Sequence, residues 1–139
     1  MKEFKGKVVI VTGASRGLGK DFALGFAKYG ATVVVAARSA EEKEGGRPVN
    51  VNATAEQIRQ LGAESMAVVT DVTNEESVNQ MVKTLDKYGK IDVLVNNAGV
   101  AVYSQIVDMP LKRFELNVKV NLYGTFLCTR AVLPTMYKP

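Results

Sequence analysis

The chain has 139 residues, of which 47% are hydrophobic and 23% are charged, and its formal net charge is +4. A chain of this length buries roughly 70% of the surface that its unfolded form exposes, so we expect residues 1–139 to form a single domain with its own core. The single cysteine excludes an internal disulfide, and the absence of histidine excludes histidine-based acid–base catalysis and histidine-ligated metal sites within these residues.

Charge distribution and apolar segments argue against two further classes of partner. A mildly basic chain favours anionic partners, but the lysines and arginines are scattered rather than clustered, so we predict no nucleic-acid binding. The apolar runs VVIV and VVVAA are far too short to cross a bilayer, and the opening MKEFKGKVVIVTG lacks the extended apolar segment of a signal peptide. We therefore predict a cytoplasmic protein without a membrane segment or a metal site.

Apolar runs typical of buried strands alternate with segments of helical periodicity. In chain order, the predicted elements are a strand at 7–12, a helix at 15–29, a strand at 32–37, a helix at 53–61, a strand at 65–69, a helix at 74–88, a strand at 91–95 and a helix from about 111 to 133. The polar segment 39–52 is predicted to be a long exposed loop. This alternation predicts an α/β fold with right-handed crossovers and a parallel sheet covered on both faces.

The glycine-rich turn TGASRGLG joins the first predicted strand to the first helix. Glycines there permit a tight turn and a close approach of phosphate to the backbone, and the helix N-terminus offers free N–H groups to a pyrophosphate. The spacing of Gly13, Gly17 and Gly19 is G-x-x-x-G-x-G, which differs from the G-x-G-x-x-G fingerprint. Taken alone, the turn supports a dinucleotide site and a turn without a ligand about equally.

The end of the second predicted strand bears on the identity of the dinucleotide. An acidic residue about 20 positions after the glycines binds the 2′-hydroxyl of NAD, but here the strand ends in Arg38 and the first acid is Glu41. Arg16 lies in the glycine turn, and two guanidiniums suit the 2′-phosphate of NADP(H). One charge-assisted contact favours NADP(H) over NAD(H) by roughly 10- to 100-fold. The alternative is that Arg38 is a solvated charge at the strand end.

Three motifs together resemble the short-chain dehydrogenase/reductase family. They are TGASRGLG after the first strand, Asp71-Val72 after the third, and NNAG at 96–99 after the fourth, and the stretches GKIDVLVNNAG and VNLYGTF are especially specific. The resemblance covers essentially the whole chain and implies a Rossmann-type, three-layer, doubly wound parallel sheet, truncated to strands in the order 3-2-1-4. It also implies hydride transfer between NADP(H) and a carbonyl or alcohol substrate. The long loop after Arg38 is found in only some members.

The resemblance also implies roles for individual residues. Asp71 is expected to accept from the adenine amino group beside the Val72 backbone, and the small residues of NNAG, which begins at Asn96, are expected to line the adenosine side. Singly, Asp71 could be a helix cap and NNAG a plain turn, but their joint occurrence weakens both alternatives. The full set of predicted cofactor residues is Gly13, Ser15, Arg16, Gly17, Leu18, Gly19, Arg38, Asp71, Val72, Asn97, Ala98 and Gly99.

Asn121 matches the catalytic asparagine of the family, which helps to hold a water chain linked to the catalytic lysine. Asparagine is unfavourable inside a helix because it competes for backbone hydrogen bonds, so a local helix distortion is the alternative. The family also uses a serine and a Tyr-x-x-x-Lys pair, in which the tyrosine exchanges a proton with the substrate oxygen. None of the five tyrosines is followed by lysine four positions later. We therefore expect the N-terminal part of such an enzyme, inactive alone.

This expectation has a structural consequence. The family topology leaves the strand at 93–95 as an open apolar edge, and it leaves the last helix without the helix that covers it in the family's subunit interface. We expect self-association through these surfaces, which include Phe114, Val118, Phe126 and Leu133. Three functions remain open: part of an NADP(H)-dependent oxidoreductase, a non-catalytic NADP(H)-binding module, and an interaction partner of a complete subunit.

Overall fold

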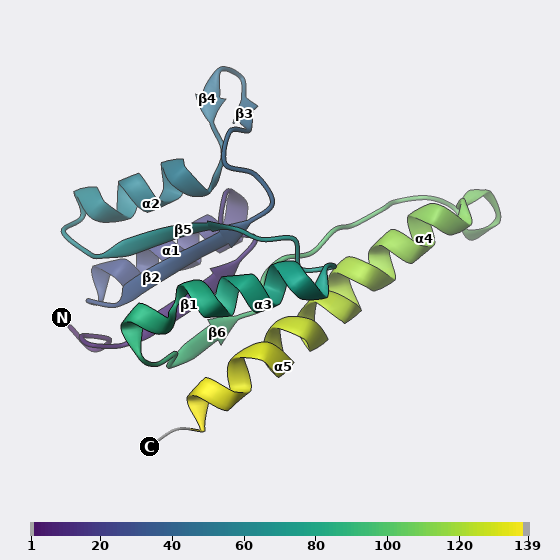
Figure 1. Ribbon diagram of the computed structural model, residues 1–139. Coiled ribbons are helices and arrows are strands. Elements are labelled where there is room, and N and C mark those ends of the chain that lie inside the picture. The colour runs from purple at the N-terminus through teal and green to yellow at the C-terminus, as the bar shows by residue number, and fades with distance from the viewer. Residues whose placement is uncertain (1, 138–139) are drawn as a thin grey trace.

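The computed structural model describes residues 2–137, so Met1, Lys138 and Pro139 lie outside the described part of the predicted 1–139 domain. Its main feature is a parallel sheet with helices on both faces (Figure 1). The strands are β1 (Val8–Thr12), β2 (Thr32–Ala37), β3 (Lys43–Glu44), β4 (Arg47–Pro48), β5 (Ser65–Val69) and β6 (Val93–Val95). The helices are α1 (Gly17–Lys28), α2 (Val51–Gln60), α3 (Glu75–Thr84), α4 (Leu111–Val118) and α5 (Gly124–Met136), with a π-helical turn at Lys119–Tyr123 and 3-10 turns at Asp86–Tyr88 and Ile106–Asp108.

The main sheet has four strands in the order β5-β2-β1-β6, and every neighbouring pair is parallel. Counted over the four long strands in chain order, this is 3-2-1-4, so the predicted topology is confirmed. Helices α1 and α2 cover one face of the sheet, and α3 and α5 cover the other (Figure 1). Ligand sites in such sheets lie at the carboxyl ends of the strands, where the chain direction of successive crossovers reverses.

The two central strands are buried on both faces, as their continuous apolar runs predict. Alternate residues of β1 face opposite layers, with Ile10 in the cluster under α3 and α5 and Val9 in the cluster under α1 and α2. Ile58 of α2 and Met81 of α3 are fully buried against these two layers. Burial of each such side chain contributes about 1.5–3 kcal/mol, which makes the sheet a rigid base for the loops at its carboxyl edge.

The fourth long strand begins at Val93, two residues later than predicted, because Asp92 pairs with the start of β1. The Asp92 carboxylate accepts a hydrogen bond from Val8 N at 2.8 Å and lies 3.3 Å from Lys90 Nζ. Burial acts to raise the pKa of Asp92, but the Val8 hydrogen bond and Lys90 outweigh it and hold that pKa below its ordinary value. A charged side chain at this point therefore fixes where β6 enters the sheet.

The polar segment 39–52 contains more structure than the predicted loop. It forms the antiparallel hairpin β3–β4 and then starts α2 at Val51, two residues before the predicted helix. The reason is Asn50, which is only 6% exposed and whose Oδ1 accepts from Ala53 N at 2.9 Å as a helix cap. The same side chain donates from Nδ2 to Glu42 O at 3.1 Å, so the cap also anchors the base of the hairpin.

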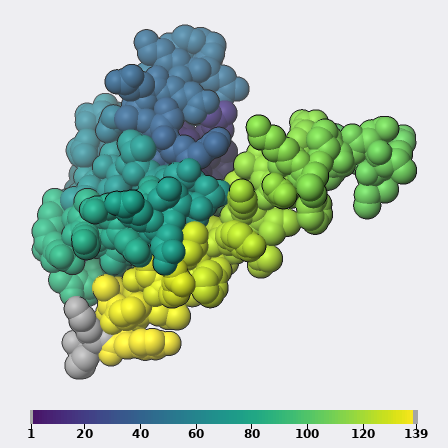
Figure 2. All heavy atoms as spheres, turned by 45° about the vertical axis from the view of Figure 1, so that its right-hand side comes forward, coloured from purple at the N-terminus to yellow at the C-terminus, as the bar shows by residue number. Residues whose placement is uncertain are grey.

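The single helix predicted from about 111 to 133 is interrupted in the middle. Residues Lys119–Tyr123 form a π-helical turn that contains Asn121, so the local helix distortion considered for this asparagine is present. The α4 segment projects away from the sheet (Figure 2), and Phe114 and Phe126 are 54% and 56% exposed. Within residues 2–137, no helix combines the length and apolar character that a membrane span needs.

Candidate functional site

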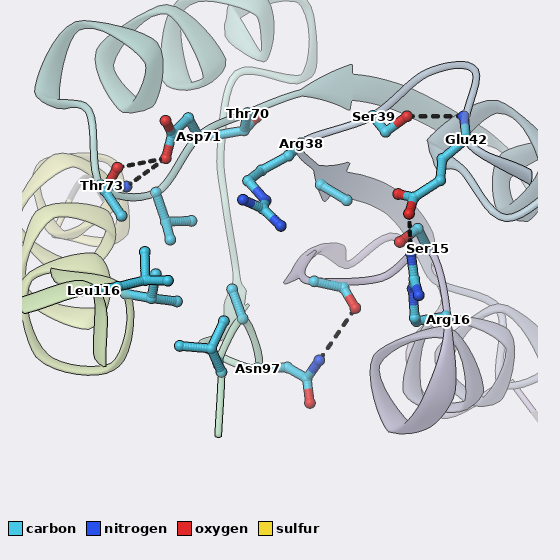
Figure 3. A pocket seen from close by; sticks show the side chains of 17 residues that line it. Ser15, Arg16, Arg38, Ser39, Glu42, Thr70, Asp71, Thr73, Asn97 and Leu116 are labelled. Atoms are coloured by element: carbon cyan, nitrogen blue, oxygen red, sulfur yellow. Dashed lines mark hydrogen bonds and ion pairs between the residues drawn. The ribbon is translucent and has the colours of Figure 1, made fainter. Parts of the chain in front are cut away.

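A cleft of about 620 Å³ lies at the carboxyl edge of the main sheet (Figure 3). The end of β2, the turn after β1 and the segments after β5 and β6 meet around it. Of the predicted cofactor residues, those that line it are Gly13, Ser15, Arg16, Arg38, Asp71, Val72, Asn97, Ala98 and Gly99. The structure therefore gathers predicted residues from Gly13 to Gly99 around one cavity.

The glycine turn is shaped by close backbone packing. Gly13 has φ +64°, and a Cβ atom there would lie 2.9 Å from Ala98 Cα. A Cβ atom on Gly19 would collide with Gly13 O and Asn97 Nδ2. These two positions therefore require glycine, because the start of α1 packs directly against the turn after β6.

Helix α1 presents its N-terminus beside the cleft. Its N-cap residue, Arg16, makes no side-chain hydrogen bond to the first-turn N–H groups, and the first turn carries no acidic residue. Such an uncapped N-terminus suits an anion. Gly17 has φ +56° and shapes the entry to the helix, whereas Leu18 is 68% exposed. Gly17, Leu18 and Gly19 do not line the cleft wall themselves.

A buried hydroxyl that the sequence analysis overlooked connects the two loops. Thr12 Oγ1 accepts from Asn97 N at 3.1 Å and from Ala98 N at 3.0 Å, and Asn97 Nδ2 donates to Gly13 O at 3.3 Å. Thr12 is 1% exposed. These bonds fix the NNAG turn against the glycine turn. The sequence could have indicated this role, because Thr12 is a polar residue that ends an otherwise apolar strand immediately before the first glycine.

Asp71 lies two residues after the end of β5, and its side chain is held by the residues that follow it. Its Oδ1 accepts from Thr73 N at 2.9 Å and from Thr73 Oγ1 at 2.7 Å. The cap of α3 is Asn74, whose Oδ1 accepts from Ser77 N at 2.8 Å. Asp71 is therefore not the helix cap, and its carboxylate is oriented at the cleft wall beside Val72.

The two arginines of the cleft have different surroundings. Arg38 lies in the middle of the cleft (Figure 3) and makes no ion pair with any residue of the part that the structure describes. Arg16 pairs with Glu42 across 2.7 Å, and this contact raises the pKa of Arg16 above its ordinary value. From the sequence, the first acid after the strand is Glu41, and the approach of the next acid was not foreseen: the chain turns back after Ser39 and places Glu42 in the cleft.

Other residues of the cleft wall were not identified from the sequence. They are Ala37, Ser39, Glu42, Thr70, Thr73, Val100, Leu116 and Val120. Several of them are sequence neighbours of predicted site residues, and this adjacency could have identified them as part of the site. Glu42 and Leu116 adjoin no predicted site residue, and they reach the cleft only through the tertiary fold.

Asn121 lies next to the cleft but binds the backbone rather than lining the cavity. Its Nδ2 donates to Val100 O and its Oδ1 accepts from Val100 N, both at 2.9 Å. A Cβ atom on Gly99 would lie 3.2 Å from Asn121 Oδ1. The asparagine therefore fastens the segment after β6 to the π-helical turn, and this pairing satisfies its side chain within a helix.

Comparison with known proteins gives a consistent family. The family model described as short chain dehydrogenase matches residues 7–139. Hydroxysteroid dehydrogenase-like protein 2 of Bos taurus is 38% identical over 134 residues, which are 96% of this chain and 32% of that protein. A 3-oxoacyl-[acyl-carrier-protein] reductase of Synechocystis sp. is 40% identical over 139 residues, which are 99% of this chain and 53% of that protein.

A solved structure extends the similarity to the fold. The crystal structure of a metagenomic short-chain oxidoreductase in complex with NADP superposes with a TM-score of 0.85 at 32% identity, and the match covers 96% of this chain and 57% of that one. The chain thus spans about a third to just over half the length of these relatives. With its matched family model, sheet order and glycine turn, this chain belongs to the short-chain dehydrogenase/reductase family.

Proposed function

We propose that residues 1–139 form one nucleotide-binding unit whose cleft binds the adenosine half of NADP(H). The observation that carries this proposal is the meeting of the glycine turn, Arg38, Asp71 and the NNAG turn around a single cleft at the carboxyl edge of the sheet. This is where open α/β sheets bind their ligands. A related structure that contains NADP supports the choice of dinucleotide.

Each part of the cleft suits one part of the nucleotide. The uncapped N-terminus of α1, with Gly13, Ser15, Gly17, Leu18 and Gly19 around its turn, would hold the pyrophosphate. Asp71 and Val72 would contact the adenine, and Asn97, Ala98 and Gly99 would pack against the adenosine. Ala98 and Gly99 line the cleft with little or no side chain, so a nucleotide there could approach their backbone closely.

Arg38 and Arg16 would contact the 2′-phosphate and give the preference for NADP(H) over NAD(H). Arg38 supports this assignment most directly, because its guanidinium faces the cleft without an ion-pair partner among residues 2–137. A planar guanidinium matches the geometry of a phosphate and gains charge-assisted hydrogen bonds that a hydroxyl does not provide.

We further propose that the chain is the N-terminal part of an oxidoreductase that transfers hydride between NADP(H) and a carbonyl or alcohol substrate. NADPH supplies the hydride in such a reaction. Asn121 is the proposed catalytic residue within these 139 residues. Its side chain is bound to the Val100 backbone, and from this position Asn121 would help to hold the water chain near the reacting groups, as the resemblance implies. Because no tyrosine is followed by lysine four positions later, residues 1–139 alone should bind the cofactor without turnover.

The proposal is tested by equilibrium titration of the purified chain with NADPH and with NADH, followed by NADPH fluorescence. The expected result is saturable binding of both, with NADPH bound roughly 10- to 100-fold more tightly. The same samples should oxidise NADPH with carbonyl substrates no faster than a blank without protein. Failure of a folded chain to bind either nucleotide would reject the proposed function. Oxidation of NADPH at enzymatic rates would reject the prediction that residues 1–139 bind the cofactor without turnover.

The exposed apolar face of the α4–α5 segment favours a second property, self-association. Phe114, Leu122 and Phe126 are each more than half exposed there, and a surface of this kind marks an interaction site. We propose that this face and the open edge of β6 pair with another copy or with a complete subunit. Sedimentation velocity of the titration samples should show species larger than a monomer, and a single monomer boundary across concentrations would contradict this.

A further inference from the structure

The ion pairing of Arg16 separates it from Arg38. Arg16 Nη2 lies 2.7 Å from Glu42 Oε1, and Arg16 Nη1 lies 3.8 Å from Glu44 Oε2. Arg38 has no such partner among residues 2–137. An anion that enters the cleft can therefore meet Arg38 directly, whereas it can engage Arg16 fully only by displacing a carboxylate.

The position of Glu42 is fixed by the backbone around it. Glu42 N donates to Ser39 Oγ at 2.8 Å, and Glu42 O accepts from Val49 N at 2.8 Å and from Asn50 Nδ2 at 3.1 Å. Asn50 is buried and also caps α2, so the strand end, the hairpin base and the helix start are tied together. Because its backbone is held on both sides, Glu42 is directed at Arg16 rather than carried on a free loop.

Glu42 also lies in the wall of the same cleft as Arg38 and Ser39, and it points at Arg16 beside the start of α1 (Figure 3). A carboxylate in that place repels any added negative charge and competes with it for Arg16. A ribose with a free 2′-hydroxyl adds no charge there, so Glu42 neither repels it nor competes with it for Arg16. The two nucleotide types therefore differ in how much they disturb the Arg16–Glu42 pair.

We propose that Glu42 is a specificity-determining residue that acts through Arg16. As a built-in counterion, it weakens the binding of a 2′-phosphorylated adenosine relative to the unphosphorylated one and so moderates the preference that Arg38 provides. The inference rests on the proposed function, because it concerns the selectivity of the same cleft. Both side chains are about half exposed, so the expected effect is moderate rather than large.

The test uses two probes of the adenosine half, adenosine 2′,5′-bisphosphate and adenosine 5′-monophosphate, titrated into the 139-residue chain by calorimetry. Glu42→Gln should tighten binding of the bisphosphate by about 3- to 10-fold and leave the monophosphate nearly unchanged. Glu41→Gln is the matched control, because it removes the same charge from the adjacent residue, which makes no ion pair within residues 2–137. This control should change the ratio of the two dissociation constants by less than about twofold.

A double-mutant cycle tests whether Glu42 acts through Arg16. In an Arg16→Gln background, Glu42→Gln should lose most of its effect on the bisphosphate, because no guanidinium remains to be released. An equal effect in both backgrounds would overturn the inference, since it would reduce Glu42 to a general negative charge. Circular dichroism and a denaturation midpoint confirm that each variant is folded before it is titrated.

Three further results would overturn the proposal in different ways. If Glu42→Gln and Glu41→Gln change the ratio equally, Glu42 has no specific role, although the proposed function stands. If Glu42→Gln weakens the monophosphate and leaves the bisphosphate unchanged, Glu42 binds the ribose hydroxyl instead. If the folded wild-type chain binds neither these probes nor NADPH and NADH, the proposed function fails, and this inference fails with it.

Discussion

Replacing Arg38 with glutamine should weaken NADPH binding by roughly 10- to 100-fold while NADH binding changes little. The reason is that Arg38 is the cleft cation without an ion-pair partner among residues 2–137, so its charge is available to a 2′-phosphate. Glutamine keeps part of the side-chain length and a hydrogen-bond donor but removes the charge. Titrations of the wild-type and Arg38→Gln chains with NADPH and with NADH at fixed ionic strength give the ratio of the two dissociation constants directly.

The matched control for this charge removal is Arg113→Gln in α4, outside the cleft wall. It should leave both dissociation constants close to those of the wild-type chain. Equal weakening of NADPH and NADH by Arg38→Gln would instead show that Arg38 contacts a group common to both nucleotides. An unchanged NADPH affinity would mean that Arg38 is a solvated strand-end charge, which was the alternative considered from the sequence.

A second large effect is expected at Gly19, where alanine should destabilise the fold by about 1–3 kcal/mol or more. The added Cβ atom would collide with the backbone carbonyl of Gly13 and with Asn97 Nδ2, and neither is the flexible end of a long side chain. Relief of that collision would separate the α1 N-terminus from the NNAG turn, so nucleotide affinity should fall together with stability. Urea denaturation followed by circular dichroism measures the free energy of unfolding.

Gly25→Ala is the matched control in the same helix. A Cβ atom at Gly25 meets nothing within 4 Å outside the helix, so alanine should stabilise the chain by about 0.5–1 kcal/mol through its higher helix propensity. The same chemical change therefore has opposite signs at two positions of α1. Two variants with similar unfolding free energies would contradict the tight packing between α1 and the turn after β6.

Most strand positions and the parallel sheet could be predicted from local patterns, whereas the strand order was expected only from the family resemblance. The continuous β-branched run before Gly13 and the similar run before Arg38 require burial on both faces, and that requirement determines a parallel sheet. A helix distortion at Asn121, satisfied locally, was also considered as an alternative, because asparagine competes for backbone hydrogen bonds within a helix; the distortion is present as a π-helical turn. The partner itself, the Val100 backbone, lies 21 residues away and leaves no local trace.

The surroundings of the arginines could not be predicted for the same reason. The approach of Glu42 to Arg16 depends on the turn after Ser39 and on Asn50, which both caps α2 and holds the Glu42 carbonyl. These are side-chain contacts with the backbone, and composition alone marked the segment as a polar loop. The sequence therefore predicted which residues surround the cleft better than it predicted which of their charges are free.

The most direct test of the central claim is to map the NADPH site by amide chemical shifts of the isotope-labelled chain. The account predicts that saturating NADPH shifts the amides of residues 13–19, 38–42, 71–73 and 97–100 most strongly, because these segments form the cleft and the α1 N-terminus. Amides on the outer face of α4 and α5 should move little. Shifts concentrated on that helical face, or no saturable shifts in a folded chain, would contradict the assignment of the cleft as the nucleotide site.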